Sequence, residues 1–103
     1  MTPEGRVKDA IRKWFAERQV YGAGTKEMAR CKNPAGWYYM PVQNGMGTTG
    51  IHDFVGVING FFFSVEAKDD DKEMTANQTR RAEEINSANG VAICVAGVDA
   101  VAP

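Results

Sequence analysis

Two carboxylates fall at matched positions on the two sides of a predicted β-hairpin. Asn59-Gly60 separates the strand-like runs 54–58 and 61–67, and this dipeptide is the strongest short signal for a two-residue hairpin turn. Such a turn fixes the pairing register, and counting outward from it brings Asp53 opposite Glu66. Directly opposed residues share one face of the sheet, with Cβ atoms about 5 Å apart.

Lys68 follows Glu66 by two residues and therefore projects to the same face. Two carboxylates at that distance repel each other, so their coexistence calls for a cation or a raised pKa. Mg²⁺ is bound by oxygen ligands, often by only one or two carboxylates, and a lysine beside them could orient a water or stabilise charge on a phosphate. The set suits metal-assisted hydrolysis of a phosphodiester. The competing interpretation is a solvated strand face with weak surface ion pairs.

Apolar periodicity and turn residues predict an α/β fold with a mixed central sheet flanked by helices. The predicted elements are, in order, a helix over 4–19, strands over 37–42, 54–58 and 61–67, a helix over 75–88 and a strand over 91–96. Thr2 and Pro3 supply a start signal for the first helix, and Gly90 a stop for the last. Glycine-rich segments predict loops over 21–35 and 44–50.

The bulk composition fits one soluble globular domain over residues 1–103, with 44% apolar and 24% charged residues. The formal net charge is -1, so the chain lacks the basic excess of many strong nucleic-acid binders, and any DNA contact must come from local basic clusters. The N-terminus has no apolar run, which predicts no signal peptide and a cytoplasmic protein. Cys31 and Cys94 have neither disulfide-framework nor zinc spacing.

A longer motif extends around the two carboxylates. Gly50-Ile51-His52-Asp53 precedes the hairpin, Glu66-Ala67-Lys68 follows it, and Gln78 lies on the next predicted helix. This arrangement resembles the VRR-NUC nucleases, a branch of the PD-(D/E)XK superfamily that also holds restriction endonucleases and archaeal Holliday-junction resolvases. The similarity runs from Glu4 to about Val95 and implies a restriction-endonuclease-like αβββαβ fold.

The resemblance also implies an active site. Asp53 and Glu66 would ligate Mg²⁺ or Mn²⁺, and the backbone carbonyl of Ala67 would be a further ligand. Lys68 would position or activate the attacking water. Together these roles imply a metal-dependent deoxyribonuclease.

Three further residues have both a site interpretation and a structural one. Gln78 would support the site, but Thr75 and Gln78 also have capping-box spacing. Glu4 matches an acidic position that completes the site in many relatives, but an acidic residue in a first turn also favours the helix dipole. His52 stands where the superfamily pattern has proline, and a packing or hydrogen-bonding role is preferred for it.

Candidate DNA contacts are basic and amide side chains in the predicted loops and on the last helix. They are Lys26, Arg30, Lys32, Gln43, Asn44, Arg80 and Arg81, each with solvated surface as the competing interpretation. The aromatic residues Trp37, Tyr38 and Tyr39 could stack on bases, although aromatic residues in a strand are more often core.

Small relatives consisting of this domain alone resemble junction resolvases, and phage and bacterial genomes carry such forms. A homodimer would place two active sites to cut two strands symmetrically. The hypothesis is therefore an endonuclease for branched DNA, such as four-way (Holliday) junctions. The alternatives are a flap or linear-duplex nuclease, a non-catalytic DNA-binding module of the same fold, and a partner-binding domain in a larger assembly.

Overall fold

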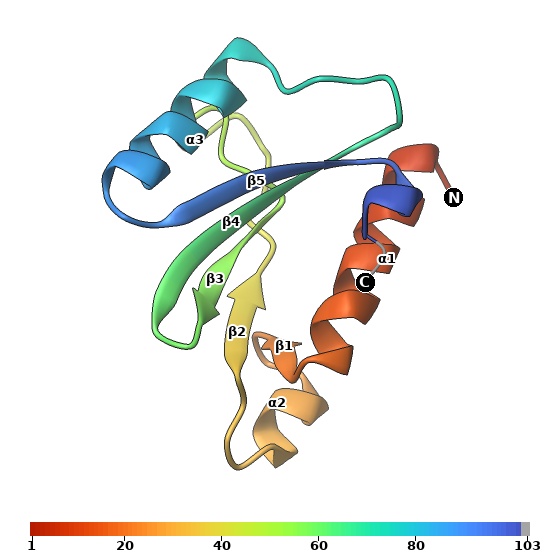
Figure 1. The fold of residues 1–103 in the computed structure, drawn as a ribbon, viewed down its shortest axis with the longest axis vertical. Coiled ribbons are helices and arrows are strands. Elements are labelled where there is room, and N and C mark those ends of the chain that lie inside the picture. Colours follow the sequence, from red (N-terminus) through yellow and green to blue (C-terminus); the bar gives the residue numbers. More distant parts are fainter. Residues whose placement is uncertain (102–103) are drawn as a thin grey trace.

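The computed structural model describes residues 1–101 and has a five-stranded mixed sheet at its centre (Figure 1). Its elements are α1 (Pro3–Glu17), β1 (Val20–Gly22), α2 (Lys26–Arg30), β2 (Gly36–Tyr39), β3 (Phe54–Ile58), β4 (Phe61–Lys68), α3 (Ala76–Ser87), β5 (Val91–Ala96) and the 3-10 helix η1 (Val98–Val101). The strands lie side by side in sequence order. The outer pairs β1–β2 and β4–β5 are parallel, and the two inner pairs are antiparallel. The predicted α/β class with a mixed sheet is confirmed.

The first helix begins at Pro3, one residue before its predicted start, and ends earlier than predicted. Thr2 caps it by accepting a hydrogen bond from the backbone nitrogen of Gly5 at 3.0 Å. The helix ends at Glu17 rather than at residue 19, because Gln19 adopts a left-handed conformation with φ of 60°. The turn leads the chain directly into β1.

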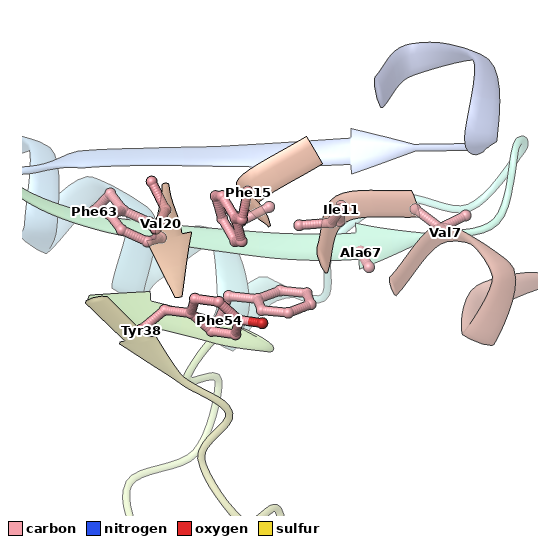
Figure 2. Packing of buried hydrophobic residues seen from close by; sticks show 9 residues of the cluster. Val7, Ile11, Phe15, Val20, Tyr38, Phe54, Phe63 and Ala67 are labelled. Atoms are coloured by element: carbon pink, nitrogen blue, oxygen red, sulfur yellow. The ribbon is translucent and has the colours of Figure 1, made fainter. Parts of the chain in front are cut away.

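The core lies between α1 and one face of the sheet (Figure 2). Phe15 is at its centre, with ring centroids 5.0 Å from Tyr38, 5.7 Å from Phe54 and 5.3 Å from Phe63. These separations are typical of favourable aromatic contacts. Towards the start of α1, the core continues through Val7, which lies near Ala67 of β4. The apolar stripe of α1 therefore anchors the helix along β4.

The β3–β4 hairpin has the predicted turn and register. Asn59 and Gly60 have φ values of 49° and 86°, which is the positive-φ pair that a type I′ turn requires. The ladder pairs Phe54 with Val65, as the two-residue turn predicts. The register of a strand sets the face to which each of its side chains projects. This turn therefore determines which side chains of β4 project towards α1 and which project to the opposite face of the sheet.

Two predictions between residues 20 and 42 are wrong. The segment 21–35 was expected to be a loop, but it contains most of β1 and all of α2. Both elements are too short to show periodicity: β1 has three residues and α2 has five. The strand predicted over 37–42 ends at Tyr39, and Pro41 lacks the N–H that a continued ladder would use.

The face of the sheet opposite α1 is covered in part by α3, which lies near β5 and β4 (Figure 1). Thr75 caps α3, as predicted. The helix ends at Ser87. The left-handed residue that follows this end is Asn89, with φ of 68°, and not the expected Gly90. Among residues 1–101, no helix is long and apolar enough to cross a bilayer.

Candidate active site

The structure brings Asp53, Glu66 and Lys68 together, at the end of the hairpin away from its turn. Asp53 directly precedes β3, and its Oδ2 accepts a hydrogen bond from the backbone nitrogen of Ala67 at 2.9 Å. Lys68 Nζ lies 3.6 Å from Oε2 of Glu66. Only 11% of the Asp53 side chain, 3% of Glu66 and 13% of Lys68 are exposed, which is far too little for a solvated surface cluster.

Glu66 is buried beside a second carboxylate, which disfavours its ionised form. Burial, followed by the negative charge of Asp53, raises the pKa of Glu66 from its ordinary 4.5 to about 7, although Lys68 acts in the opposite direction. Its Oε1 is buried and has no hydrogen-bond partner among the described residues. A buried carboxylate oxygen without a partner is costly, and a bound cation would satisfy it.

Gln78 serves its own helix and the cluster at the same time. Its Oε1 accepts from the backbone nitrogen of Thr75 at 2.9 Å, and the Thr75 hydroxyl accepts from the backbone nitrogen of Gln78, which completes the capping box. Its Nε2 donates to Oε2 of Glu66 at 3.2 Å. The two interpretations of Gln78 are therefore compatible, because the amide uses its oxygen for the cap and its nitrogen for the carboxylate.

The first turns of α1 approach the cluster from the other side. Lys8 Nζ lies 3.5 Å from Oδ1 of Asp53 and 3.6 Å from Oε2 of Glu4. Glu4 is close enough to contribute to the raised pKa of Glu66. Sequence reasoning missed Lys8. Its spacing of four residues from Glu4 places both side chains on one face and was the available signal.

His52 is a buried hydrogen-bonding residue, as preferred from the sequence. It is 1% exposed, with Nδ1 2.8 Å from the hydroxyl of Ser64 and Nε2 2.9 Å from the backbone carbonyl of Gln78. A carbonyl only accepts, so Nε2 carries a proton and donates it to the carbonyl of Gln78. His52 thus ties the first turn of α3 to β4, which holds Gln78 against Glu66. Sequence reasoning gave no signal for Ser64.

The structure does not bring the basic residues of α2 to the cluster. Lys26 and Arg30 are exposed on α2, at the bottom of Figure 1, whereas α1 begins near its upper right. The 15 residues of α1 lie between the two regions and span about 22 Å. Lys32 follows α2 and is also exposed. Contacts from these residues to DNA would be remote from the carboxylates.

The other candidate DNA contacts lie nearer the cluster. Arg80 and Arg81 belong to α3, the helix of Gln78, and they pair with Asn77 at 2.9 Å and Glu84 at 3.0 Å respectively. The loop between β2 and β3 holds the two amide candidates. Gln43 donates to the backbone carbonyl of Ile51 at 3.1 Å, and Asn44 accepts from the backbone nitrogen of Met46 at 3.0 Å.

Comparison with known proteins agrees with this arrangement at the level of the fold. No protein-family model and no curated protein sequence matches the chain. A solved structure described as a VRR_NUC domain superposes with a TM-score of 0.70 at 19% sequence identity, covering 98% of this chain and 91% of the other. The chain has the fold of a VRR_NUC domain.

The VRR_NUC fold confirms the restriction-endonuclease-like α/β architecture expected from the resemblance. In this chain the fold includes β1 and α2 in addition to the expected αβββαβ order. In this chain, the hairpin, the end of β4 and the first turn of α3 hold the carboxylates.

Proposed function

We propose that this chain is a metal-dependent DNA endonuclease, formed as a single domain over residues 1–103. The observation that supports the proposal best is the buried pair of Asp53 and Glu66 with Lys68 beside it, on a VRR_NUC fold. A non-catalytic DNA-binding module has no use for two carboxylates held together near phosphates, because they would repel the ligand.

The donor set fits Mg²⁺ or Mn²⁺. Among residues 1–101, no group of three or more His, Cys, Asp or Glu side chains is close enough to hold a metal ion, so the protein would supply two carboxylates. That number is ordinary for Mg²⁺, which keeps several waters and takes further ligands from substrate phosphates. Among the residues that the structure describes, the buried Oε1 of Glu66 has no hydrogen-bond partner, and Asp53 keeps its Oδ1 for Lys8 or an ion.

The backbone carbonyl of Ala67 is the third proposed ligand. The carbonyl of Lys68 accepts from the backbone nitrogen of Gly97 and so points towards β5. Neighbouring residues of a strand direct their backbone groups to opposite sides, so we expect the carbonyl of Ala67 to be on the side of β4 where Asp53 lies. The nitrogen of Ala67, which donates to Asp53, points the same way.

Each remaining residue has a role that its contacts support. When bound, the metal supplies a Lewis acid that stabilises charge on the phosphate oxygens. Lys68 holds the attacking water or a phosphate oxygen, since its 3.6 Å separation from Glu66 is longer than a charge-assisted hydrogen bond and leaves its protons available. Gln78 orients the carboxylate of Glu66. Glu4 acts through Lys8, which keeps Asp53 in place.

For the substrate we propose branched DNA, such as four-way junctions, cut by a homodimer. This rests on the resemblance to the VRR-NUC nucleases, whose superfamily also holds junction resolvases, and on the symmetry of a two-fold pair of sites. Arg80, Arg81, Gln43 and Asn44 are the proposed phosphate contacts nearest the site, and the remote set on and after α2 would bind an arm of a longer substrate. A bacterial or phage-infected cytoplasm stays a prediction.

The proposal is tested by incubating the protein with labelled four-way junction, flap and linear duplex in Mg²⁺, Mn²⁺ or EDTA. We expect cleavage that needs the metal and is fastest on the junction. Equal rates on all three DNAs would keep the nuclease and remove the junction preference. Folded protein that cuts none of them with either metal would favour the non-catalytic module.

A further inference from the structure

A groove of the surface lies beside the carboxylates rather than over them. It has a volume of about 740 Å³ and lies between the exposed side of β2–β4 and the loop of residues 41–51. Trp37, Tyr39, Val57 and Phe62 form its apolar floor. We refer to these four residues and the loop as the aromatic groove. Its volume falls within the range of about 300–1,000 Å³ that is usual for sites enclosing a small molecule.

Strand register explains why these aromatic side chains are not core. Trp37 pairs with Val57, and Val57 with Phe62, so all three project to the face opposite α1. Tyr38 projects to the other face and is 9% exposed, so it belongs to the core and cannot stack on a base. In contrast, 46% of Tyr39 and 47% of Phe62 are exposed.

The aromatic groove lies next to the proposed active site. Glu66 lies on the same face as Phe62, and Asp53 follows the groove residue Ile51 by two positions. Val55 pairs with Tyr39 and lies two residues along β3 from Asp53, a step of about 7 Å at 3.3 Å per residue. Tyr39 is also one strand spacing of about 5 Å away, so it lies about 8 Å from Asp53 in all. That is about two nucleotide steps of a stacked strand.

The chemistry of the groove wall suits nucleic acid. None of the groove-lining residues carries a charge, so nothing there repels a phosphate backbone. The loop contributes amide and hydroxyl groups from Gln43, Asn44, Thr48 and Thr49, and several glycines that let a backbone approach closely. Trp37 and Tyr39 have ring centroids 5.7 Å apart, which presents two adjacent aromatic surfaces.

We propose that the aromatic groove binds unpaired bases of the DNA strand that enters the active site, an inference that rests on the proposed nuclease function. Bases within a duplex are already stacked, so exposed aromatic side chains select bases that are unpaired. A second copy of the chain is a less suitable occupant of the aromatic groove than DNA. A two-fold contact would bring the same hollow surface of both copies together, leaving both grooves unfilled.

The test measures binding of two labelled DNAs with Ca²⁺ in place of Mg²⁺: a short duplex with a single-stranded thymidine tail, and the same duplex with blunt ends. We expect wild type to prefer the tailed duplex. Tyr39→Ala and Phe62→Ala should each weaken binding of the tailed duplex by about 5- to 150-fold, the range for losing one stacked base. Phe61→Ala is the matched control, because Phe61 is adjacent and 65% exposed but projects to the other face.

A second readout needs no substitution in the groove. In a Trp14→Phe protein, Trp37 is the remaining tryptophan, and its fluorescence should be quenched by the tailed duplex and not by the blunt one. Equal affinity of wild type, Tyr39→Ala and Phe62→Ala for the tailed duplex, or no quenching, would overturn the proposal. So would sedimentation showing a wild-type dimer that Tyr39→Ala and Phe62→Ala convert to monomers.

Cleavage in Mg²⁺ separates this proposal from the nuclease on which it rests. Wild type that binds tailed DNA through the groove but cuts no DNA would refute the nuclease and leave base binding established. Wild type that cuts DNA, with tail binding unchanged in Tyr39→Ala and Phe62→Ala, would refute base binding and leave the nuclease intact.

Discussion

Replacing Glu66 with glutamine should stabilise the metal-free protein at high pH. Glu66 is 3% exposed, and burial together with the charge of Asp53 raises its pKa to about 7. Glutamine has nearly the same shape, and its oxygen can still accept the hydrogen bond from Gln78. The variant therefore resembles the protonated form of wild type at every pH.

The size of the effect follows from proton linkage. An unfolded Glu66 titrates near its ordinary pKa of 4.5, so between pH 4.5 and about 7 the folded chain binds more protons than the unfolded chain. The free energy of unfolding of wild type therefore falls as pH rises through this window. The shift corresponds to about 3 kcal/mol, which is fully expressed above pH 7 and absent below pH 4.5. Between pH 5 and pH 8 the difference amounts to about 2.5 kcal/mol.

The assay is urea unfolding of wild type and Glu66→Gln in EDTA at pH 5 and pH 8. The stability of the variant relative to wild type should increase by about 2.5 kcal/mol between the two pH values. Glu83→Gln, at an exposed position of α3, controls for the loss of one negative charge and should follow wild type. Stability curves of wild type and Glu66→Gln that run parallel with pH would refute the reasoning.

Three other perturbations test the surroundings of the carboxylates. His52→Ala removes two buried hydrogen bonds and a buried ring. It should lower the free energy of unfolding, measured with urea, by about 3 kcal/mol. A loss of less than about 1 kcal/mol would contradict the buried geometry of His52. Thr75→Ala and Gln78→Ala should each cost about 1 kcal/mol through the capping box, but only Gln78→Ala should also slow DNA cleavage, because only Gln78 contacts Glu66. Equal cleavage by both variants would limit Gln78 to capping. As the pH is raised towards 7, Mn²⁺ affinity measured by calorimetry should increase about tenfold per pH unit, because the proton on Glu66 must leave before the ion binds. A Mn²⁺ affinity that does not depend on pH would remove Glu66 as a ligand.

The site was predictable where one local signal fixed the geometry. Asn59-Gly60 sets the hairpin register, and the register alone brings Asp53 beside Glu66 and Lys68. Helical spacing of apolar residues predicted the first helix in the same way. These features depend on residues that are close together in the chain, within one helical turn or one hairpin, so they can be predicted from the sequence alone.

The remainder depends on contacts between distant segments. β1 has only three residues, and it is a strand because it pairs in parallel with β2. No sequence pattern within three residues predicts a strand. The hydrogen bonds of His52 join three separate elements and follow only from the packing of α3 on the sheet. The opposite directions of Tyr38 and Tyr39 were implied by the strand period, but which face α1 covers was not.

The most direct test of the proposed mechanism compares DNA cleavage by wild type, Lys68→Ala and Lys72→Ala in saturating Mg²⁺, with EDTA as the metal-free control. Lys68 contacts Glu66, whereas Lys72 lies exposed in the loop after β4. We predict metal-dependent cleavage by wild type and Lys72→Ala, and a rate for Lys68→Ala that is lower by about 10²–10⁴-fold. Cleavage by folded Lys68→Ala at the wild-type rate, or cleavage by wild type that persists in EDTA, would contradict the assignment of this cluster as the active site.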